Sequence, residues 1–373
     1  MRKGEKLLDD VIGERKADHI EISLKENVQA LKATTGFEDV NLIHKALPEL
    51  EREKIDLSTT VFGYKFSAPF FVGAMTGGTQ KAIKINAAIA EAVEELHLGM
   101  GVGSQRIAID NPKVEHSFSV VREKAPTAFI IANIGGPQLV SKYGVKEAKR
   151  AVDMIKANAL AVHLNSLQEA VQPEGETNYS NLFQNICKLA QELPIPVIVK
   201  ETGAGIAAEE AAMLEAAGVA GIDVAGAGGT SWAAVEYYRA KARNDDVSKR
   251  LGETFWDWGI PTAVSLVETV KSARLPVIAS GGLRTGIDVT KSLALGASLA
   301  SATFPFLEPA TKGSEDVKKA LQYLIGEVRN AMFLVGASSV QKLQNIPVVV
   351  TGKTAQWLAL RGFQPEVYAR RKL

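Results

Sequence analysis

Short apolar runs alternate with amphipathic stretches along most of the chain from residue 67 onward. Eight runs have the length and composition of buried strands: Pro69–Ala74, Gly99–Val102, Ala128–Ala132, Ala159–His163, Pro196–Lys200, Gly221–Ala225, Pro276–Ser280 and Ser298–Ala302. Between them apolar residues recur at helical spacing, as in residues 83–93 and 208–217. Strands that alternate with helices predict βαβ units and a parallel sheet.

Eight such units over roughly 240 residues match the size of an α/β (β/α)8 TIM barrel. A doubly wound sheet is the alternative, although it seldom needs eight regular units. We predict one domain over residues 1–373, with an N-terminal extension at 1–66, the barrel core at 67–312 and C-terminal helices at 313–373. A charged insertion at 240–259 follows the sixth strand.

Polar or glycine-rich residues follow every predicted strand, as in Met75-Thr-Gly-Gly78, Asn133-Ile-Gly-Gly136 and Lys200-Glu-Thr-Gly203. Barrel enzymes build their sites at the carboxyl ends of their strands. A purely structural protein would not need such residues at all eight positions. The pattern therefore predicts a catalytic or cofactor-binding barrel.

The fourth strand leads into the densest polar stretch, His163–Gly175. Buried polar groups cost free energy unless they find partners, so a ligand is the simplest explanation for this stretch. Glu169 is a candidate ligand for a hard cation such as Mg²⁺. Gln168 is uncharged and a poor general base, so it would orient a reacting group. His163 is either an acid or base, or a hydrogen-bonded packing residue.

The seventh strand is followed by Gly281-Gly-Leu-Arg-Thr-Gly286, and the eighth ends in Ser301-Ala302. This is the commonest barrel arrangement for a phosphate, which backbone N–H groups and a helix N-terminus would face. An ordinary tight turn is the alternative. Gly226-Ala-Gly-Gly229 matches the dinucleotide fingerprint incompletely and is discounted.

Several charged side chains have more than one interpretation. Lys200 would be a Schiff-base lysine, a cation beside an electron-rich cofactor, or a lysine that reaches solvent. Arg15, Lys16 and Arg106 would hold a diphosphate if they converge, but each taken singly is more often a surface charge. Glu236 is a second carboxylate for the site or part of an exposed helix face.

Composition and charge narrow the class of protein. The chain has 373 residues, 46% hydrophobic and 23% charged, which is typical of a globular protein. Its formal net charge of +1, without long charged blocks, gives no indication of nucleic acid or a membrane surface. A single cysteine, Cys187, excludes a disulfide framework. The charged N-terminus and the lack of long apolar runs lead us to expect a cytoplasmic protein without signal peptide or membrane span.

With these residues assembled, the chain resembles the flavin-dependent, type 2 isopentenyl diphosphate isomerases, and among them the archaeal members most. The matching blocks span nearly the whole chain in the family's order: Arg15-Lys16-x-x-His19, Met75-Thr-Gly-Gly78, Gly101-Val-Gly-Ser-Gln-Arg106, His163-Leu-Asn165, Gln168-Glu169, Gln172-Pro-Glu-Gly175, Val199-Lys200-Glu201, Gly228-Gly-Thr-Ser-Trp232, Asp257-Trp-Gly259 with Pro261-Thr262, and Ser280-Gly-Gly-Leu-Arg284.

The resemblance implies reversible isomerisation of isopentenyl to dimethylallyl diphosphate in isoprenoid biosynthesis. FMN in its reduced form would act as acid and base, with Mg²⁺ at Glu169 and NAD(P)H as reductant. The implied FMN contacts are Ala74, Met75, Thr76, Ser104, Asn133, Lys200, Thr230, Gly281, Gly282, Leu283, Arg284, Ser301 and Ala302. The implied substrate contacts, partly from the N-terminal extension, are Arg15, Lys16, His19, Ser104, Gln105, Arg106 and Gln168. The implied catalytic residues are Gln168, His163, Asn165 and Lys200, in a homo-oligomer that is a tetramer or octamer.

Two rival functions remain at this point. Another FMN barrel would oxidise a 2-hydroxy acid or a dihydropyrimidine, but hydroxy-acid oxidation needs a histidine base paired with a carboxylate, and the cluster Arg15, Lys16 and Arg106 favours a diphosphate instead. A sensor barrel without catalysis would bind flavin or phosphate and turn nothing over.

Overall fold

The computed structural model of this chain describes residues 15–372. The first part of the predicted extension therefore lies outside the described residues, together with the charged start on which the signal-peptide expectation rests. Within the described chain, no helix combines the length and the apolar character that a membrane crossing requires.

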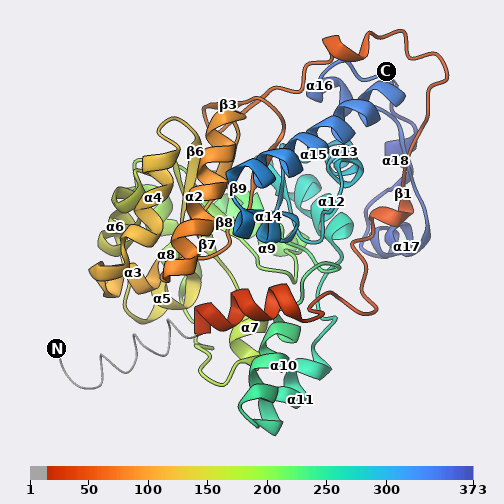
Figure 1. The fold of residues 1–373 in the computed structure, drawn as a ribbon. Helices are drawn as coiled ribbons and strands as arrows, with labels where there is room; N and C mark the ends of the chain where they lie inside the picture. The colour runs from red at the N-terminus through yellow and green to blue at the C-terminus, as the bar shows by residue number, and fades with distance from the viewer. Residues whose placement is uncertain (1–14, 373) are drawn as a thin grey trace.

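Eight parallel strands close into a barrel in chain order (Figure 1). They are β4 (Phe70–Val72), β5 (Gly99–Gly101), β6 (Phe129–Gly135), β7 (Ala159–His163), β8 (Val197–Lys200), β9 (Gly221–Asp223), β10 (Val277–Ala279) and β11 (Leu299–Ala302). Each coincides with one of the eight apolar runs, since strands covered on both faces carry nearly continuous apolar sequence. The predicted TIM barrel is confirmed.

Helices surround the barrel and follow the strands in turn. They are α2 (Gln80–Glu95), α4 (His116–Lys124), α6 (Val145–Ile155), α8 (Leu182–Glu192), α9 (Ala208–Ala216), α12 (Thr262–Ser272), α13 (Gly286–Leu295), and the pair α14 (Phe304–Lys312) and α15 (Ser314–Leu334). The helical spacing at residues 83–93 and 208–217 falls in α2 and α9, and those two expectations are confirmed as well.

The amino ends of the strands are closed by a hairpin of β2 (Thr59–Val61) and β3 (Tyr64–Phe66). At its turn Phe62 stacks on Phe129 of β6, with ring centroids 6.1 Å apart. Phe66 is fully buried and joins the apolar side chains that fill the barrel interior. Because this end is filled, a ligand can enter only from the carboxyl ends of the strands.

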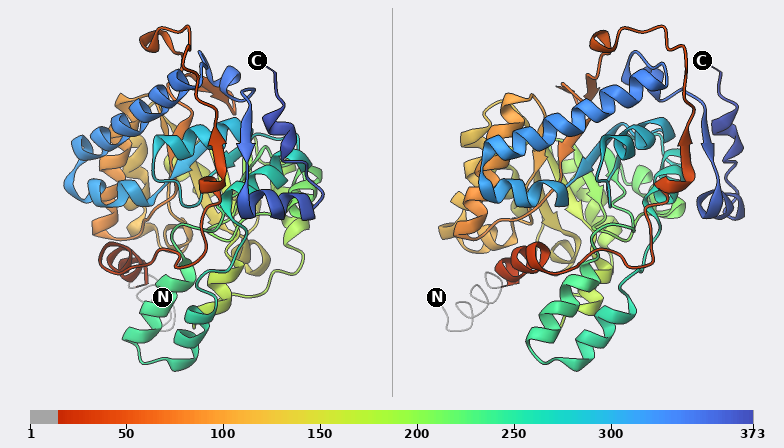
Figure 2. Two further views of the ribbon diagram at one scale, coloured as in Figure 1. Left: turned by 90° about the vertical axis from the view of Figure 1, so that its right-hand side faces the viewer. Right: turned by 45° about the vertical axis from the view of Figure 1, so that its right-hand side comes forward.

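The N-terminal and C-terminal segments pair with each other. β1 (Val40–Leu42) forms an antiparallel two-stranded sheet with β12 (Val348–Val350), next to α16 (Val340–Leu343), α17 (Gly352–Leu360) and α18 (Glu366–Ala369). Figure 2 shows the N-terminal segment running past these last helices on its way to the barrel. The predicted C-terminal helices are present, whereas the strand β12 was not expected.

Additional helices gather around the open end of the barrel. They are a helix at residues 15–25, α3 (Arg106–Asp110), α5 (Gly136–Ser141), α7 (Ser166–Val171), α10 (Trp232–Ala242) and α11 (Asp246–Thr254). The charged insertion is thus largely helical, and Figure 1 shows α10 and α11 projecting beyond the barrel beside the helix at 15–25.

Candidate active site at the barrel mouth

A cavity of about 280 Å³ opens at the carboxyl ends of the strands. Most of the predicted site residues line it, from the N-terminal helix and from the loops of all eight strands: Arg15, Lys16, His19, Ala74, Met75, Thr76, Ser104, Arg106, Asn133, His163, Asn165, Gln168, Glu169, Lys200, Thr230, Gly281, Gly282, Arg284, Ser301 and Ala302. Residues from opposite ends of the sequence therefore converge on one space.

Two predicted residues do not line this cavity. Gln105 is fully buried: its Oε1 accepts the N–H of Asn133 at 2.9 Å, and its Nε2 donates to the carbonyl of Ala151 at 2.8 Å. It therefore fixes the loop after β5 against β6 and α6. Leu283 belongs to the apolar core, while its neighbours in the turn face the cavity.

The helix at residues 15–25 covers one side of the cavity with cations. Lys16 Nζ donates to the carbonyl of Ser104 at 2.7 Å. Burial, together with the nearby charges of Arg15 and Arg106, lowers the pKa of Lys16 to about 7. Three cations gathered in this way suit a ligand with several negative charges.

His19 and Glu236 join this helix to α10. The two side chains meet at 2.9 Å, and the His19 ring packs edge-on against Trp232 with centroids 5.1 Å apart. Burial lowers the pKa of His19, and the hydrogen bond with Glu236 opposes this shift. Glu236 is completely buried, so the structure excludes the alternative that it belongs to an exposed helix face.

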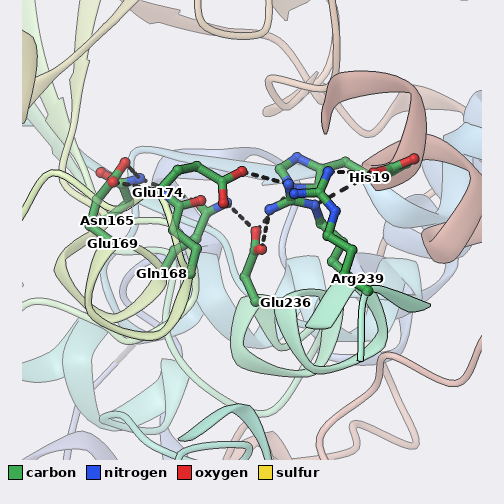
Figure 3. A network of polar contacts seen from close by, with 10 residues as sticks. His19, Asn165, Gln168, Glu169, Glu174, Glu236 and Arg239 are labelled. Atoms are coloured by element: carbon green, nitrogen blue, oxygen red, sulfur yellow. Dashed lines mark hydrogen bonds and ion pairs between the residues drawn. The ribbon is translucent and has the colours of Figure 1, made fainter. Parts of the chain in front are cut away.

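Glu236 is the centre of a polar network (Figure 3). Its Oε1 also accepts the N–H of Gln168 Nε2 at 3.2 Å, and its Oε2 meets Arg239 Nη1 at 2.5 Å. Burial alone would raise the pKa of Glu236, but the hydrogen bond from His19 and the charge of Arg239 lower it to about 2. Arg239 in turn contacts Glu174 at 2.5 Å.

The Glu169 carboxylate lies in a second cluster. Its Oε1 accepts from Asn165 Nδ2 at 2.9 Å, and its Oε2 accepts from Gln172 Nε2 at 2.5 Å and from the N–H of Glu176 at 2.7 Å. The buried Oε1 of Gln172 has no hydrogen-bond partner in the described residues. An amide oxygen without a partner next to a carboxylate is suited to a hard cation or a water.

Asn165 also holds the Gln168 side chain. Its Nδ2 lies 3.2 Å from Gln168 Oε1, so the amide of Gln168 is held by Asn165 on one side and by Glu236 on the other. Glu176, whose N–H is bonded to Glu169, also forms a 2.5 Å ion pair with Arg106. The predicted stretch His163–Gly175 is thus a structured wall of the cavity.

His163 is hydrogen-bonded to Asn133. Since Asn133 Nδ2 donates to the carbonyl of Val102, its Oδ1 faces His163 Nδ1 at 2.7 Å, and Nδ1 must carry the hydrogen. Burial and the charge of Lys200 lower the pKa of His163 to about 3. His163 is therefore neutral at pH 7 and can only accept a hydrogen bond at Nε2.

The glycine turn after β10 forms the opposite end of the cavity. Gly281 and Gly282 have φ of 100° and 75°, and a Cβ on Gly281 would lie 2.2 Å from the carbonyl oxygen of Gly226. Only glycine suits such a turn. Arg284 is held by Gln29 at 2.6 Å and lies 5.0 Å from the centre of the Phe304 ring, which keeps its guanidinium at the rim.

Sequence reasoning missed three residues with clear roles here. Arg239 is almost fully buried although arginine is usually exposed. Gln29 bonds to Arg284, and Gln138 bonds to Glu176. The spacing of Glu236 and Arg239, three residues apart on one helix, is the one local signal that would have paired them.

A family model described as FMN-dependent dehydrogenase matches residues 9–108 and 138–349 of this chain. Curated archaeal relatives match this chain over nearly its whole length at about half-identical sequence. Isopentenyl-diphosphate delta-isomerase of Methanosarcina barkeri is 52% identical over 95% of this chain and 96% of its own length. The chain belongs to the isopentenyl-diphosphate delta-isomerase family. The corresponding proteins of Thermococcus kodakarensis (50% identical, 93% and 94% covered) and Methanothermobacter thermautotrophicus (46%, 97% and 100%) agree.

Solved structures support the architecture of this isomerase-family chain. A flavocytochrome b2 variant with sulfite bound has a TM-score of 0.63 at 18% identity and covers 93% of this chain and 88% of its own. A mandelate oxidase variant has a TM-score of 0.57 at 19% identity, with 85% and 90% covered. At such identities the likeness concerns the fold alone.

The buried network predicts a pH-dependent loss of stability in Glu236→Gln. Removing one partner of a buried ion pair leaves Arg239 short of a counter-charge, and we expect the free energy of unfolding at pH 7 to fall by about 3–5 kcal/mol. Because the pKa of about 2 in the folded protein lies below the ordinary value of 4.5, the contribution is complete above pH 4.5 and is lost as pH falls toward 2.

Urea denaturation at a series of pH values measures this difference. The gap between wild type and Glu236→Gln should narrow below pH 4.5, and the exposed control Glu308→Gln should match wild type throughout. A gap that stays constant between pH 7 and pH 3 would contradict the assignment.

Proposed function

We propose that this protein interconverts isopentenyl and dimethylallyl diphosphate, with FMN bound at the barrel mouth and Mg²⁺ beside Glu169. The observation that carries the proposal is the convergence of Arg15, Lys16 and Arg106 on the same cavity as Gln168 and the glycine turn. Cations for a diphosphate, a fixed amide and an anion-binding turn then face one space.

The residues present fit FMN. The turn at Gly281 and Gly282, with Arg284 and the start of α14 nearby, offers backbone N–H groups and a guanidinium to a phosphate. A flat ring would lie toward Asn133 of β6 and Lys200 at the end of β8. When bound and reduced, FMN supplies an electron-rich ring that can exchange a proton with the substrate.

The residues also fit Mg²⁺ that is completed by substrate. No group of three or more His, Cys, Asp or Glu side chains among residues 15–372 forms a ready-made metal site. One carboxylate, Glu169, with the unpartnered Oε1 of Gln172 beside it, resembles the usual magnesium arrangement of a single carboxylate, waters and substrate phosphates.

The protein's own side chains then have separate roles. Arg15, Lys16 and Arg106 bind the diphosphate and fix its position. Gln168, whose amide is held from both sides, orients the alkene end of the substrate. Neutral His163 accepts a hydrogen bond and does not serve as the acid, because its pKa of about 3 leaves it unprotonated.

The hydrocarbon chain needs an apolar surface, and Met75, Trp232, Phe304 and Leu307 line the cavity for it. Such a wall also excludes water from a reacting carbon that develops positive charge. NAD(P)H as the reductant, the tetramer or octamer, and the cytoplasmic location remain predictions from the family resemblance.

The deciding experiment is an anaerobic assay of the purified protein with FMN and Mg²⁺. We expect conversion of isopentenyl diphosphate only after the flavin is reduced by NADPH or dithionite, because the proposed reaction uses the reduced ring. Since the reaction has no net redox change, one reduction should support many turnovers. Product is measured by chromatography of the diphosphates. Oxygen uptake with a 2-hydroxy acid would support the oxidase alternative, and bound FMN without turnover would support the sensor.

Gln168→Asn should lose turnover with FMN retained. The shorter side chain cannot reach both Asn165 and Glu236, and displacement of a positioning group by about 1 Å can cost about 100-fold in rate. Turnover is compared with bound FMN absorbance, and the exposed control Gln341→Asn should behave as wild type. Normal turnover in Gln168→Asn would remove this residue from the mechanism.

Diphosphate binding should take up a proton through Lys16. With a pKa of about 7, Lys16 is mostly neutral at pH 8, and an anionic ligand favours its charged form. We expect uptake of about one proton at pH 8 and much less at pH 6, measured by calorimetry in buffers of different ionisation enthalpy. Lys16→Arg, which is always charged, should take up none. Equal uptake by both proteins would contradict the role of Lys16.

A further inference from the structure

Three neighbouring strands place Lys200, Asp223 and Ser280 side by side; Lys200 and Ser280 line the cavity, and Asp223 lies in a smaller space that Lys200 also lines. Lys200 of β8 and Asp223 of β9 are register partners, and Ser280 follows β10, the next strand in the barrel. Lys200 Nζ lies 3.6 Å from Asp223 Oδ2, and the Ser280 hydroxyl donates to Asp223 Oδ1. Asp223 is only 4% exposed.

Burying a carboxylate at this position costs free energy of folding. The small space around Asp223 and Lys200 is otherwise lined mainly by apolar groups, among them Phe71, Ile131 and Ile278. A valine or alanine would fill such a barrel layer at no electrostatic cost. Lys200 is the cation that pairs with Asp223 in the described structure, so the benefit of this carboxylate has to come through the lysine.

The Lys200 ammonium has two contacts in the described structure and one further N–H group. Its ammonium donates to the carbonyl of Glu201 at 2.8 Å and faces Asp223. An ammonium has three N–H donors, which leaves one for a ligand in the cavity that Lys200 lines. Asp223 thus fixes the direction of that N–H group and offsets part of the positive charge of Lys200.

We infer that Asp223, held by Ser280, is a positioning residue that acts through Lys200 to set the reduction potential of the bound flavin. The inference rests on the proposed FMN site. Reduction adds negative charge to the flavin ring, and a lysine nearby favours the reduced form. A carboxylate behind that lysine weakens this preference, so the reduced ring stays more electron-rich and a better proton carrier.

Asp223→Asn tests this directly, because asparagine keeps the shape and can still bond to Ser280. We expect FMN binding to persist and the equilibrium constant for FMN reduction to rise at least tenfold, or about 30 mV for a two-electron couple. Anaerobic dye-coupled titration of the FMN-loaded protein measures the midpoint potential. The matched control is Asp153→Asn, an exposed aspartate on α6, which should leave the potential unchanged.

A double-mutant cycle separates an effect through Lys200 from a direct one. In a Lys200→Met background, adding Asp223→Asn should shift the potential far less than it does in wild type. An equal shift in both backgrounds, or an unchanged potential in Asp223→Asn itself, overturns the inference.

If Asp223→Asn fails to fold, the midpoint potential of Ser280→Ala tests the inference instead. It keeps both charges but leaves Lys200 as the main partner of the carboxylate, so the potential should fall; an unchanged or higher potential overturns the inference. The proposed function is judged separately. If the wild-type protein isomerises isopentenyl diphosphate but the variants leave the midpoint potential unchanged, only the role of Asp223 is refuted. A wild-type protein that binds no FMN refutes both.

Discussion

A carboxylate without exposed surface, that of Glu236, constrains the whole open end of this barrel. A buried charge is tolerated only when every partner is in place. The partners of Glu236 come from the helix at residues 15–25, from α7 and from α10 itself. The carboxylate therefore ties these three segments together, and the cations of the N-terminal helix line the same cavity as Gln168.

Two of the cations that line the cavity are paired with carboxylates before any ligand arrives. Arg106 contacts Glu176, and Lys200 lies beside Asp223. Such pairs hold long side chains in fixed positions and keep like charges from repelling the folded chain. A diphosphate would then meet donors that are already oriented, which lowers the entropy cost of binding. Lys16 lacks such a carboxylate contact among the described ion pairs, and its lowered pKa reflects that difference.

The barrel could be predicted from sequence because buried parallel strands leave a signal that needs no knowledge of tertiary contacts. Asn133 and Lys200 could be placed at the mouth for the same reason, since topology alone sends strand ends to one face. Arg239 could not, because an arginine on a helix is normally exposed, and its burial depends on Glu174 and Glu236 together. Gln105 shows the same limit: Ser104 and Arg106 on either side line the cavity, but its own direction is set by β6 and α6.

The pairing of β1 with β12 has a consequence for how the molecule is made. Asn41 and Val349 are 308 residues apart, so at ordinary translation speeds the ribosome needs roughly 15–60 s to produce the second after the first. Throughout that interval the N-terminal segment has neither its strand partner nor, for much of it, the helix α10 that anchors His19. The barrel walls can form while the chain is growing, and the helix at residues 15–25 can dock once α10 has been made. The sheet of β1 and β12, by contrast, cannot form until residue 350 has been added. The pairing that joins the N-terminal segment to the C-terminal helices is thus completed only after all eight barrel strands have been synthesised.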